Sequence, residues 1–514
     1  MGRKKWFYLS GIAISPSIMQ LGDLIQRLTA ISIQGPLDRE ITAVRYDSRR
    51  VGPGNLFVAV RGASFDGHSF IEQAVEKGAS AVVGEQTGLS QRATTIVVPD
   101  SREALARLAA TFYSDPSRKL KVIGVTGTNG KSTTTFLIKH LLERANQSTG
   151  LIGTVQYQVG QRVLPAQRTT PESLDLQELL SQCVEAGCRN VVLEVSSHAL
   201  SQGRATEIAF DVGAFTNLTQ DHLDFHQGMK GYFEAKARLF ESVRDNQKKE
   251  KVGVINIDDP YGQQLVARFG RDLPTITYGM GARAEFRASN FKVELTGSSY
   301  QLDTKEKSYL VRLPLIGRFN IYNSLAALAV AHAIGVDTRT SVLALANAPQ
   351  IPGRLEAVPA RRQFQVFVDY AHTDDALLNV VRTCRDLRPN RLILVFGCGG
   401  NRDTTKRPLM GAVADQYADY AIITSDNPRK EDPEAIVRDI EAGFKNKNYE
   451  KVVDRKKAIA RAIALAQPRD IVLIAGKGHE KYQEFGDHTI PFDDVEVAAR
   501  VLEEHPVELS RHGS

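Results

Sequence analysis

The chain has 514 residues, of which 42% are hydrophobic and 24% are charged, and its formal net charge at pH 7 is +6. This length predicts two to four domains, each large enough for its own core, and the composition is typical of a soluble globular protein. Lys and Arg are interleaved with Asp and Glu, which argues against a nucleic-acid-binding surface. The four cysteines show no metal-ligand spacing, so we expect a reduced, cytoplasmic protein.

The N-terminus carries a short apolar run, residues 6–14, after three basic residues. Ser10 and Gly11 interrupt this run and no clean small-residue cleavage site follows it, which argues against a signal peptide. Nothing later approaches the roughly 20 apolar residues that a membrane span needs. We therefore expect residues 1–18 to be an extension and Met19 to begin the folded protein.

The next part of the chain predicts a small α/β unit. Short apolar runs at 56–60 and 81–83 predict strands on either side of a helix over 69–77. A further helix is expected over 102–113, with Ser101 as its N-cap.

A glycine-rich stretch, residues 125–133, predicts a phosphate-binding loop between a buried strand and a helix. Gly127 and Gly130 let backbone N–H groups turn towards a phosphate chain. Lys131 supplies a positive charge for the outer phosphates, and Ser132 supplies a hydroxyl for the accompanying Mg²⁺. An ordinary glycine turn is the alternative, but such a turn needs neither the lysine nor the hydroxyl. The strict Walker pattern has Gly at the first position of this stretch, where valine stands here.

Two strands expected at 191–195 and 212–216 are followed by polar side chains, and parallel sheets place ligands at such strand ends. Glu194 and Ser196 lie at the end of the first strand, where a carboxylate can hold Mg²⁺; a purely structural Glu is the alternative. Residues 217–226 hold two acids and two histidines, a composition that also suits zinc, although cysteine partners are lacking.

Four near-continuous apolar runs later in the chain predict a third group of strands. They lie at 365–369, 392–396, 420–424 and 471–475. Such runs suit parallel strands that are covered on both faces. The fold class is therefore α/β with mostly parallel sheets.

Six motifs occur together and in chain order. They are the loop Gly127-Thr-Asn-Gly-Lys-Ser-Thr, Glu194-Val-Ser-Ser-His, Asn217-Leu-Thr-x-Asp-His-Leu-Asp-x-His, Gly317-x-Phe-Asn-x-x-Asn, Pro-Gly-Arg354 and Asp369-Tyr-Ala-His. In this combination the chain resembles the Mur ligase family of peptidoglycan synthesis, from about Leu21 to the C-terminus. The resemblance implies a small α/β domain for the UDP part of the substrate (19–100), a central P-loop ATPase domain (101–353) and a Rossmann-like domain that receives the amino acid (354–514).

The resemblance implies an ATP-dependent amide ligase that adds the third residue of the stem peptide. Its substrates would be UDP-N-acetylmuramoyl-L-Ala-D-Glu, meso-diaminopimelate and ATP with Mg²⁺, in a monomeric protein. An amide does not form directly from a carboxylate, because oxide is a very poor leaving group. Phosphorylation by ATP gives an acyl phosphate, which the incoming amine attacks; the phosphoryl transfer itself needs positioning and charge neutralisation.

The resemblance also assigns roles around the nucleotide. The expected catalytic residues are Lys131, Glu194, His222 and Lys236. The expected ATP-binding residues are Gly127, Thr128, Asn129, Gly130, Lys131, Ser132, Thr133, Asn320 and Arg354. The expected magnesium ligands are Ser132, Glu194, His222 and Lys236, the last as a carbamate (N6-carboxylysine). Carbamylation turns a cation that repels the metal into an anionic oxygen ligand; from the residues alone, a plain surface lysine at a helix end is the simpler interpretation.

Two more groups of residues follow from the resemblance. The UDP-muramoyl dipeptide is expected at Tyr46, Ser48, Thr169, Thr170, Ser196, Gln202 and Arg204. Diaminopimelate is expected at Arg402, Asp426, Asn427, Pro428, Arg429, Gly476 and Glu480. Arg429 can grip the distal carboxylate of diaminopimelate, which lysine lacks, although Asn-Pro-Arg as a plain tight turn is the alternative. Asp374 and Asn401 depart from the usual family residues, Pro and Asp, which leaves the fine geometry of those loops open.

Three other functions remain as alternatives. The chain could add L-lysine, or it could be another ligase of the same superfamily such as a folylpolyglutamate synthetase. The segments Asp426–Arg429 and Gly476–Glu480 argue against the second of these. A non-enzymatic ligase-like scaffold is disfavoured because Lys131, Glu194 and Lys236 are all present.

Overall fold

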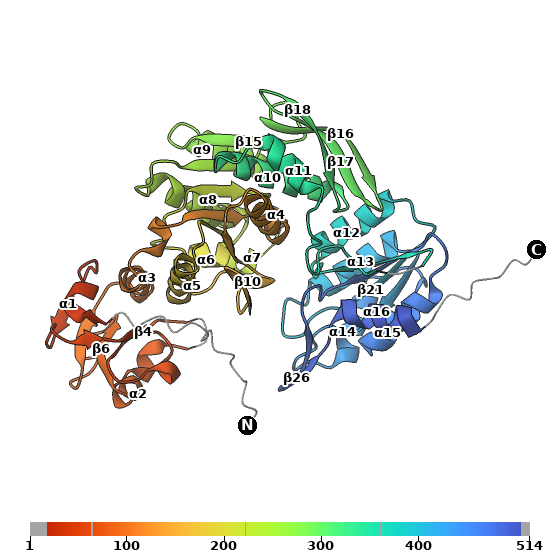
Figure 1. The fold of residues 1–514 in the computed structure, drawn as a ribbon. Helices are drawn as coiled ribbons and strands as arrows, with labels where there is room; N and C mark the ends of the chain where they lie inside the picture. Colours follow the sequence, from red (N-terminus) through yellow and green to blue (C-terminus); the bar gives the residue numbers. More distant parts are fainter. Residues whose placement is uncertain (1–17, 63–64, 222, 360–361, 505–514) are drawn as a thin grey trace, which may run out of the picture.

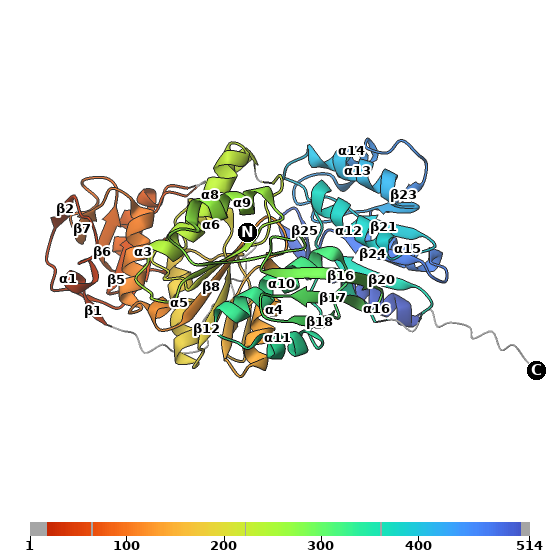
Figure 2. The same ribbon diagram turned by 90° about the horizontal axis from the view of Figure 1, so that it is seen from above.

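The computed structural model describes residues 18–62, 65–221, 223–359 and 362–504. Within them, three main sheets follow one another along the chain, with the N-terminal sheet and the C-terminal sheet at opposite ends of the molecule (Figure 1). Figure 2 shows the same order from above, with the central sheet between the other two. No helix of the described part is long and apolar enough to cross a membrane. The α/β class predicted from the sequence is confirmed.

The N-terminal sheet has the order β2-β7-β6-β5-β4, in which β4 to β7 are parallel and β2 is antiparallel to β7. Its strands are β2 (Ser32–Gln34), β4 (Ala43–Arg45), β5 (Asn55–Val58), β6 (Ala79–Gly84) and β7 (Thr94–Val97). Beside it lie β1 (Met19–Gln20), α1 (Leu21–Leu24), β3 (Glu40–Ile41) and α2 (Ile71–Glu76). The helix expected over 69–77 begins as a 3-10 turn, Gly67–Phe70.

Helix α3 (Ser101–Phe112) corrects one prediction. Its N-cap is Asp100 and not Ser101, because the Asp100 carboxylate accepts hydrogen bonds from the backbone N–H groups of Arg102 and Glu103. Its apolar residues share a core with the N-terminal sheet, and another face packs on α5 (Ser173–Glu185). The expected division at residue 100 thus falls before a helix that bridges the N-terminal and central parts.

The central sheet has the order β11-β10-β9-β12-β8-β13-β14-β15-β16-β17-β18. In this spatial order, the strands from β9 through β12, β8, β13, β14 and β15 to β16 pair in parallel. Antiparallel strands extend both edges: β10 and β11 beside β9, and β17 and β18 beside β16. The strands are β8 (Lys121–Thr126), β9 (Thr149–Ile152), β10 (Gln156–Val159), β11 (Arg162–Pro165), β12 (Asn190–Glu194), β13 (Val212–Phe215), β14 (Val252–Asn256), β15 (Thr275–Gly279), β16 (Phe286–Glu294), β17 (Gly297–Asp303) and β18 (Ser308–Leu313). Strand β8, which leads into the glycine-rich loop, therefore lies between the strands that carry the next two motifs.

Helices cover both faces of the central sheet. They are α4 (Lys131–Arg144), α5, α6 (Ser197–Ser201), α7 (Leu223–His226), α8 (Met229–Asp245), α9 (Pro260–Phe269), α10 (Arg318–Ala333) and α11 (Thr338–Leu345). One core is built from α4, α10 and α11, and the other from α5, α8 and α9. Burial on both faces explains why the central strands are apolar throughout.

The C-terminal sheet has the order β19-β20-β24-β21-β22-β23 and is parallel except for β19. Its strands are β19 (Glu356–Ala357), β20 (Gln365–Asp369), β21 (Leu392–Phe396), β22 (Tyr420–Ile423), β23 (Tyr449–Lys451) and β24 (Ile471–Ala475), followed by a hairpin of β25 (Tyr482–Phe485) and β26 (His488–Pro491). Helices α12 (Asp374–Asp386), α13 (Lys406–Tyr417) and α14 (Pro433–Glu441) pack on one face, and α15 (Arg455–Leu465) and α16 (Asp494–Glu504) pack on the other.

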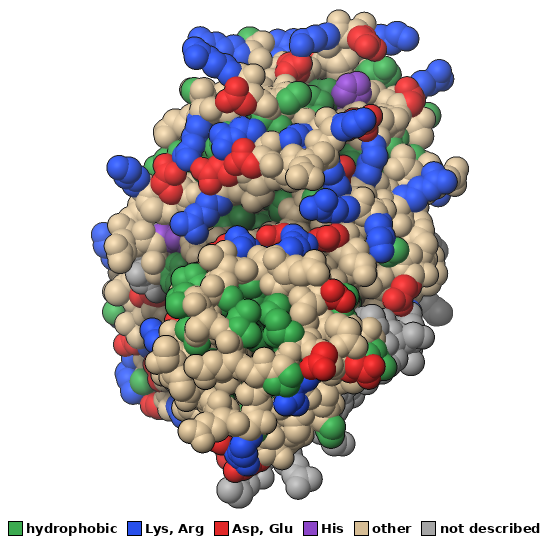
Figure 3. Space-filling view, turned by 90° about the vertical axis from the view of Figure 1, so that its left-hand side faces the viewer, with side chains coloured by type: hydrophobic (Ala, Val, Ile, Leu, Met, Phe, Trp, Pro, Cys, Tyr) green, Lys and Arg blue, Asp and Glu red, His purple; other side chains and the backbone are tan. Residues whose placement is uncertain are grey.

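Surface charge follows the interleaving seen in the sequence. On the face at the N-terminal end of the molecule, Lys and Arg side chains are interspersed with Asp and Glu, mainly above a small hydrophobic patch (Figure 3).

Candidate functional site

The glycine-rich loop has the geometry of a phosphate cradle. Gly127 has φ 150° and Gly130 has φ 84°, which favours glycine, and a Cβ atom at either residue would collide with a neighbour. At Gly127 the obstacle is the Thr216 hydroxyl, and at Gly130 it is the side-chain oxygen of Asn323. Both glycines are therefore required by packing as well as by the turn.

Lys131 lies at the N-terminus of α4 and folds back over the loop. Its ammonium donates to the carbonyl oxygens of Gly127 (3.0 Å) and Thr128 (2.8 Å). Burial lowers the pKa of Lys131, and the carboxylates of Glu194 and Asp221 act in the opposite direction. The ammonium thus lies at the loop and donates to carbonyl groups that a phosphate oxygen could replace.

Glu194 ends strand β12 and is fully buried. Its carboxylate accepts hydrogen bonds from the Ser132 hydroxyl (3.1 Å) and from the backbone N–H and hydroxyl of Thr154 (both 2.9 Å). The Ser132 hydroxyl also accepts from an Arg354 Nη atom at 3.1 Å. A hydroxyl and a carboxylate side by side are the oxygen donors that Mg²⁺ prefers, so this pair fits the predicted metal role.

Lys236 comes from α8 and is buried beneath the loop with 1% of its surface exposed. Its amine donates to the Gly127 carbonyl at 2.7 Å and lies 4.5 Å from the centre of the Tyr232 ring. Burial, reinforced by the charge of Lys131, holds the pKa of Lys236 well below its usual range. This position excludes the plain surface lysine, and a buried neutral amine is the form that reacts with carbon dioxide.

His222 lies outside the described residues. Around it, the 217–226 segment braces the loop: the Asn217 side chain accepts from the backbone N–H of Asn129 at 2.9 Å. His226 is buried, contacts the Ser197 hydroxyl at 2.9 Å and stacks on Tyr232. In the described part of the chain, no group of three or more His, Cys, Asp or Glu side chains is placed to hold a metal ion such as zinc.

The two expected nucleotide residues outside the glycine-rich loop, Asn320 and Arg354, have different surroundings. Asn320, at the start of α10, is 2% exposed; its side chain donates to the Ile316 carbonyl (2.9 Å) and accepts from Asn323 (3.0 Å). Its amide is thus used inside the protein and supports the Asn323 side chain that packs on Gly130. Arg354 instead reaches Ser132 across the junction with the C-terminal sheet and lies 4.9 Å from the Tyr370 ring centre.

A second contact across that junction was not predicted from the sequence. Asp375, in the first turn of α12, accepts hydrogen bonds from the Asn129 side chain (3.2 Å) and the Thr219 hydroxyl (3.1 Å). Asn129 is the tip of the glycine-rich loop, so the C-terminal part of the chain contacts the loop directly. Short motifs give no signal for this contact, because the residues are 246 positions apart.

Most of the predicted muramoyl-peptide residues lie together beside Glu194. The Thr170 hydroxyl donates to the Glu194 carbonyl at 2.8 Å and accepts from the Ser196 N–H at 3.1 Å. Thr169 contacts the Thr154 hydroxyl at 3.0 Å, and Arg204 donates to the Thr170 carbonyl at 3.2 Å and to Gln202 at 2.6 Å. The predicted set therefore forms one hydrogen-bonded group next to the predicted metal ligands.

Glu172 is a residue that the sequence did not single out. Its buried carboxylate pairs with Arg168 (2.6 Å), Arg204 (3.1 Å) and Arg102 (3.4 Å). Three guanidinium groups around one carboxylate leave a local excess of positive charge where α3 meets the central sheet. That excess suits a diphosphate or a carboxylate ligand.

Tyr46 and Ser48 lie on the N-terminal sheet and are engaged by protein partners. The Tyr46 hydroxyl donates to Asp175 at 2.6 Å, and burial, followed by the Asp175 charge, raises the pKa of Tyr46. The Ser48 hydroxyl donates to Gln73 at 3.0 Å and is almost fully buried. Tyr46 thus contacts α5 of the central part, close to Glu172 and its arginines, whereas the Ser48 partner Gln73 lies in the N-terminal part.

Except for Arg402, the predicted acceptor residues lie on two segments, 426–429 and 476–484, which follow β22 and β24; we call these the acceptor loops. Arg429 donates to the Glu484 carboxylate (3.1 Å) and to the Gly400 carbonyl (2.8 Å). Asn427 donates to Glu480 at 2.8 Å. Arg402 is exposed, with its stem near Gly399.

Gly476 and Pro428 are placed where the backbone passes close to neighbouring atoms. Gly476 has φ +118°, and a Cβ there would lie 2.6 Å from an Asp426 carboxylate oxygen, so only glycine fits. The Pro428 carbonyl lies against Gly400, where any side chain would collide with it. Lys477, which was not predicted, is fully buried between the two loops.

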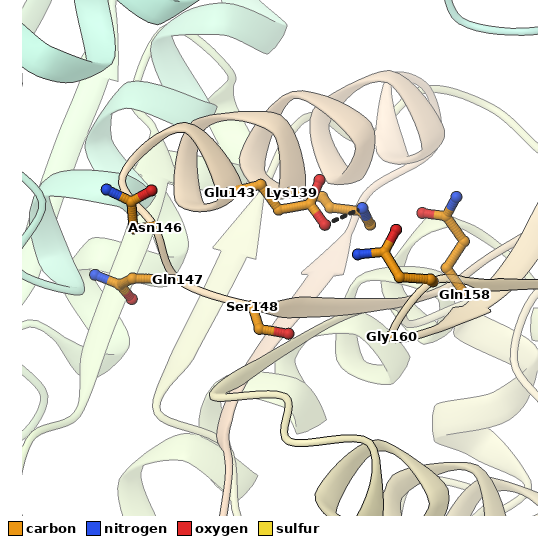
Figure 4. A pocket seen from close by; sticks show the side chains of 8 residues that line it. Lys139, Glu143, Asn146, Gln147, Ser148, Gln158 and Gly160 are labelled. Carbon is orange, nitrogen blue, oxygen red and sulfur yellow. Dashed lines mark hydrogen bonds and ion pairs between the residues drawn. The ribbon is translucent and has the colours of Figure 1, made fainter.

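Two hollows lie apart from the glycine-rich loop. One, of about 330 Å³, is lined by polar side chains at the far end of α4, including Lys139, Glu143 and Gln158 (Figure 4). None of the predicted site residues lines it. The other, of about 550 Å³, lies between α3 and α8 and includes Gln202.

Three family models match the chain. They are the Mur ligase family catalytic domain over residues 40–113, the Mur ligase middle domain over 125–331 and the Mur ligase glutamate ligase domain over 353–478.

Curated relatives match nearly the whole chain. The UDP-N-acetylmuramoyl-L-alanyl-D-glutamate--2,6-diaminopimelate ligase of Syntrophomonas wolfei is 47% identical over 488 residues, which cover 94% of this chain and 99% of that protein. The protein of the same name from Geobacillus thermodenitrificans is 46% identical over 490 residues, covering 95% and 100%. A solved structure of a ligase of this name is 32% identical, with a TM-score of 0.68 and coverage of 95% of this chain and 99% of that one.

Proposed function

The chain belongs to the Mur ligase family, and we propose that it joins meso-diaminopimelate to the D-Glu carboxyl of UDP-N-acetylmuramoyl-L-Ala-D-Glu at the expense of ATP. The relatives that share 46–47% of its residues carry the name of this reaction. The observation that carries the proposal is the convergence of Lys131, Ser132 and Glu194 above the buried Lys236. An amide ligase of this kind requires such a phosphoryl-transfer site.

The chain's own residues suit the first step, transfer of the γ-phosphoryl group to the substrate carboxylate. The loop N–H groups and the Lys131 ammonium hold the phosphate chain and offset the charge that spreads over its oxygens during transfer. Ser132, Glu194, carbamylated Lys236 and His222 are the residues that would hold Mg²⁺, which neutralises phosphate charge when bound.

The second step is attack by the amine of the acceptor on the acyl phosphate, with phosphate as the leaving group. The acceptor loops lie at the carboxyl ends of β22 and β24, where parallel sheets present ligands. Arg429 has one Nη atom and its Nε atom bonded within the protein, and these bonds fix the plane of its guanidinium group, which supports its proposed role in binding the acceptor's distal carboxylate. The arginines around Glu172 suit the anionic groups of the muramoyl substrate.

The domain roles follow the same proposal. Residues 19–100 would bind the UDP part, 101–353 would bind ATP, and 354–514 would bind the amino acid. The protein would act in the cytoplasm as a monomer.

The test is an ATP-dependent ligation assay with purified protein. With UDP-N-acetylmuramoyl-L-Ala-D-Glu, Mg²⁺ and meso-diaminopimelate, we expect stoichiometric ADP release and a tripeptide product that mass spectrometry identifies. L-Lysine, D-Ala-D-Ala and a folate with glutamate serve as competing substrate sets. A clear preference for any of these sets over diaminopimelate would overturn the proposal.

A further inference from the structure

Lys477 is a buried cation at the centre of the acceptor loops. Its ammonium donates to the Asn427 side-chain oxygen (3.0 Å) and to the Glu480 carboxylate (3.2 Å), and it lies 3.9 Å from a carboxylate oxygen of Asp426. Lys477 has no exposed surface. It therefore offsets two carboxylates and also fixes the Asn427 amide, whose NH₂ group then points to Glu480.

Glu484, on the hairpin formed by β25 and β26, places a negative charge beside Arg429. Its carboxylate accepts from Nε of Arg429 at 3.1 Å, and its backbone carbonyl accepts from the Arg429 N–H at 2.9 Å. Its own N–H donates to Asn427 at 3.1 Å. The hairpin thus delivers a negative charge to the arginine that we expect to bind the acceptor.

The charged side chains gathered by the loops balance one another. The cations are Arg402, Arg429 and Lys477, and the anions are Asp426, Glu480 and Glu484. Arg402 belongs to this group because its stem and the Arg429 head both lie against Gly399. Two buried arginines at the border of the loops have carboxylate partners of their own: Arg407 pairs with Glu431 and Asp439, and Arg455 pairs with Asp494. Leaving these outer pairs aside, Arg402, Arg429 and Lys477 equal Asp426, Glu480 and Glu484 in number.

We propose that Lys477 and Glu484 set the net charge of the acceptor pocket, and so match it to an acceptor whose far end carries an ammonium and a carboxylate together. This inference rests on the proposed function and extends it to two residues outside the predicted binding set. A zwitterionic far end adds no net charge to the pocket, and its ammonium and its carboxylate can each pair with a side chain of opposite charge. A far end with one charge leaves an uncompensated charge among partly buried groups, which is unfavourable in a low-dielectric pocket.

Three acceptors that differ only at the far end give a direct test. meso-Diaminopimelate ends in a zwitterion, L-lysine ends in an ammonium, and 2-aminopimelate ends in a carboxylate. The inhibition constants of lysine and 2-aminopimelate against diaminopimelate ligation report their binding even where neither is ligated. The quantity to compare is the ratio of these two constants in each variant.

Lys477→Met removes one positive charge, so lysine should bind roughly 10-fold better relative to 2-aminopimelate than in the wild type. Lys477→Arg keeps the charge and should restore the wild-type ratio. Glu484→Gln removes one negative charge, so 2-aminopimelate should bind better relative to lysine by roughly the same factor. Exposed Lys481 and Asp487 lie in the same segment, and Lys481→Met and Asp487→Asn are the matched controls. We expect both controls to leave the ratio unchanged.

Shifts of opposite sign in the two variants support the proposal. Equal ratios in wild type, Lys477→Met and Glu484→Gln overturn it, as do shifts of the same sign. If Lys477→Met does not fold, Glu484→Gln decides alone, since Glu484 lies on a surface hairpin with its side chain 30% exposed. Failure of the wild type to use diaminopimelate contradicts the proposed function instead, so the two failures are distinguishable.

Discussion

The nucleotide end and the acceptor end of the molecule are built in different ways. At the nucleotide end, seven consecutive residues from Gly127 to Thr133 supply the backbone turn, the cation and the hydroxyl, and packing admits only glycine at two of them. At the acceptor end, the contacts join side chains about fifty positions apart, such as Asn427 and Glu480. A short motif is enough to predict the local backbone turn and its cation. At the acceptor end the resemblance named several residues, but which charges pair with one another becomes clear only when the fold brings the two loops together.

Lys131→Ala tests the nucleotide end and should have the largest effect. Removal of the ammonium that neutralises phosphate charge should lower kcat by about 10³-fold with every acceptor alike. The measurement is steady-state ADP release with diaminopimelate, alongside thermal unfolding to verify the fold. Lys139→Ala, on the same helix but paired with Glu143, is the control and should keep normal turnover. Near-normal activity of Lys131→Ala would contradict the assignment of the loop.

Lys236→Ala tests whether the buried lysine is a carbamate. We expect a loss of activity on the order of 10²-fold and partial recovery with added acetate, which can replace the missing carboxylate ligand. Because the pKa of Lys236 is lowered, its neutral and reactive form grows as pH rises through that lowered value, so bicarbonate should sustain activity at a pH where ordinary lysines stay protonated. Lys230→Ala, exposed on the same helix, is the control.

A high-resolution structure with magnesium bound, in bicarbonate-containing buffer, that shows an unmodified Lys236 amine would remove the carbamate from the mechanism.

Arg429→Ala should weaken the use of diaminopimelate without affecting the binding of ATP. Loss of a charge-assisted hydrogen bond to the distal carboxylate should lower kcat/KM for diaminopimelate by roughly 30-fold, while the KM for ATP stays unchanged. Arg438→Ala, an exposed arginine on α14, is the control. An equal rise in both KM values would mean that Arg429 supports the fold rather than the acceptor.

The sequence was sufficient for the parts of the molecule that short-range patterns control. The strands at 365–369, 392–396 and 471–475 have the predicted bounds, because parallel strands with buried centres leave nearly continuous apolar runs. The N-cap of α3 was wrong by one residue, since Asp100 and Ser101 are both good caps and only geometry separates them.

The side-chain partners were the harder part. Burial of Lys236 could not be predicted from its surroundings in the sequence, and the resemblance alone pointed to it. The partners of Asn320, the Ile316 carbonyl and the Asn323 side chain, were likewise not predicted, and its expected role at the nucleotide stays a prediction. Lys477 and Glu484 were missed because their contacts with Asn427 and Arg429 form only when the fold brings the other acceptor loop beside them. These residues depend on tertiary contacts, which neither periodicity nor turn chemistry encodes.

Asp375→Ala tests one of the contacts that join the C-terminal part of the chain to the glycine-rich loop, and it should have the smallest effect. The Asp375 carboxylate accepts from Asn129 at the tip of the glycine-rich loop and from Thr219, so its loss should raise the KM for ATP by roughly 5-fold with little change in kcat. Asp374→Ala is the matched control, because Asp374 lies in the same first turn of α12. A double-mutant cycle with Thr219→Val should give a coupling of about 1 kcal/mol, which loss of stability alone does not produce. Additive effects of the two substitutions would mean that the nucleotide end and the acceptor end work independently, and that the C-terminal part of the chain does not help to order the loop.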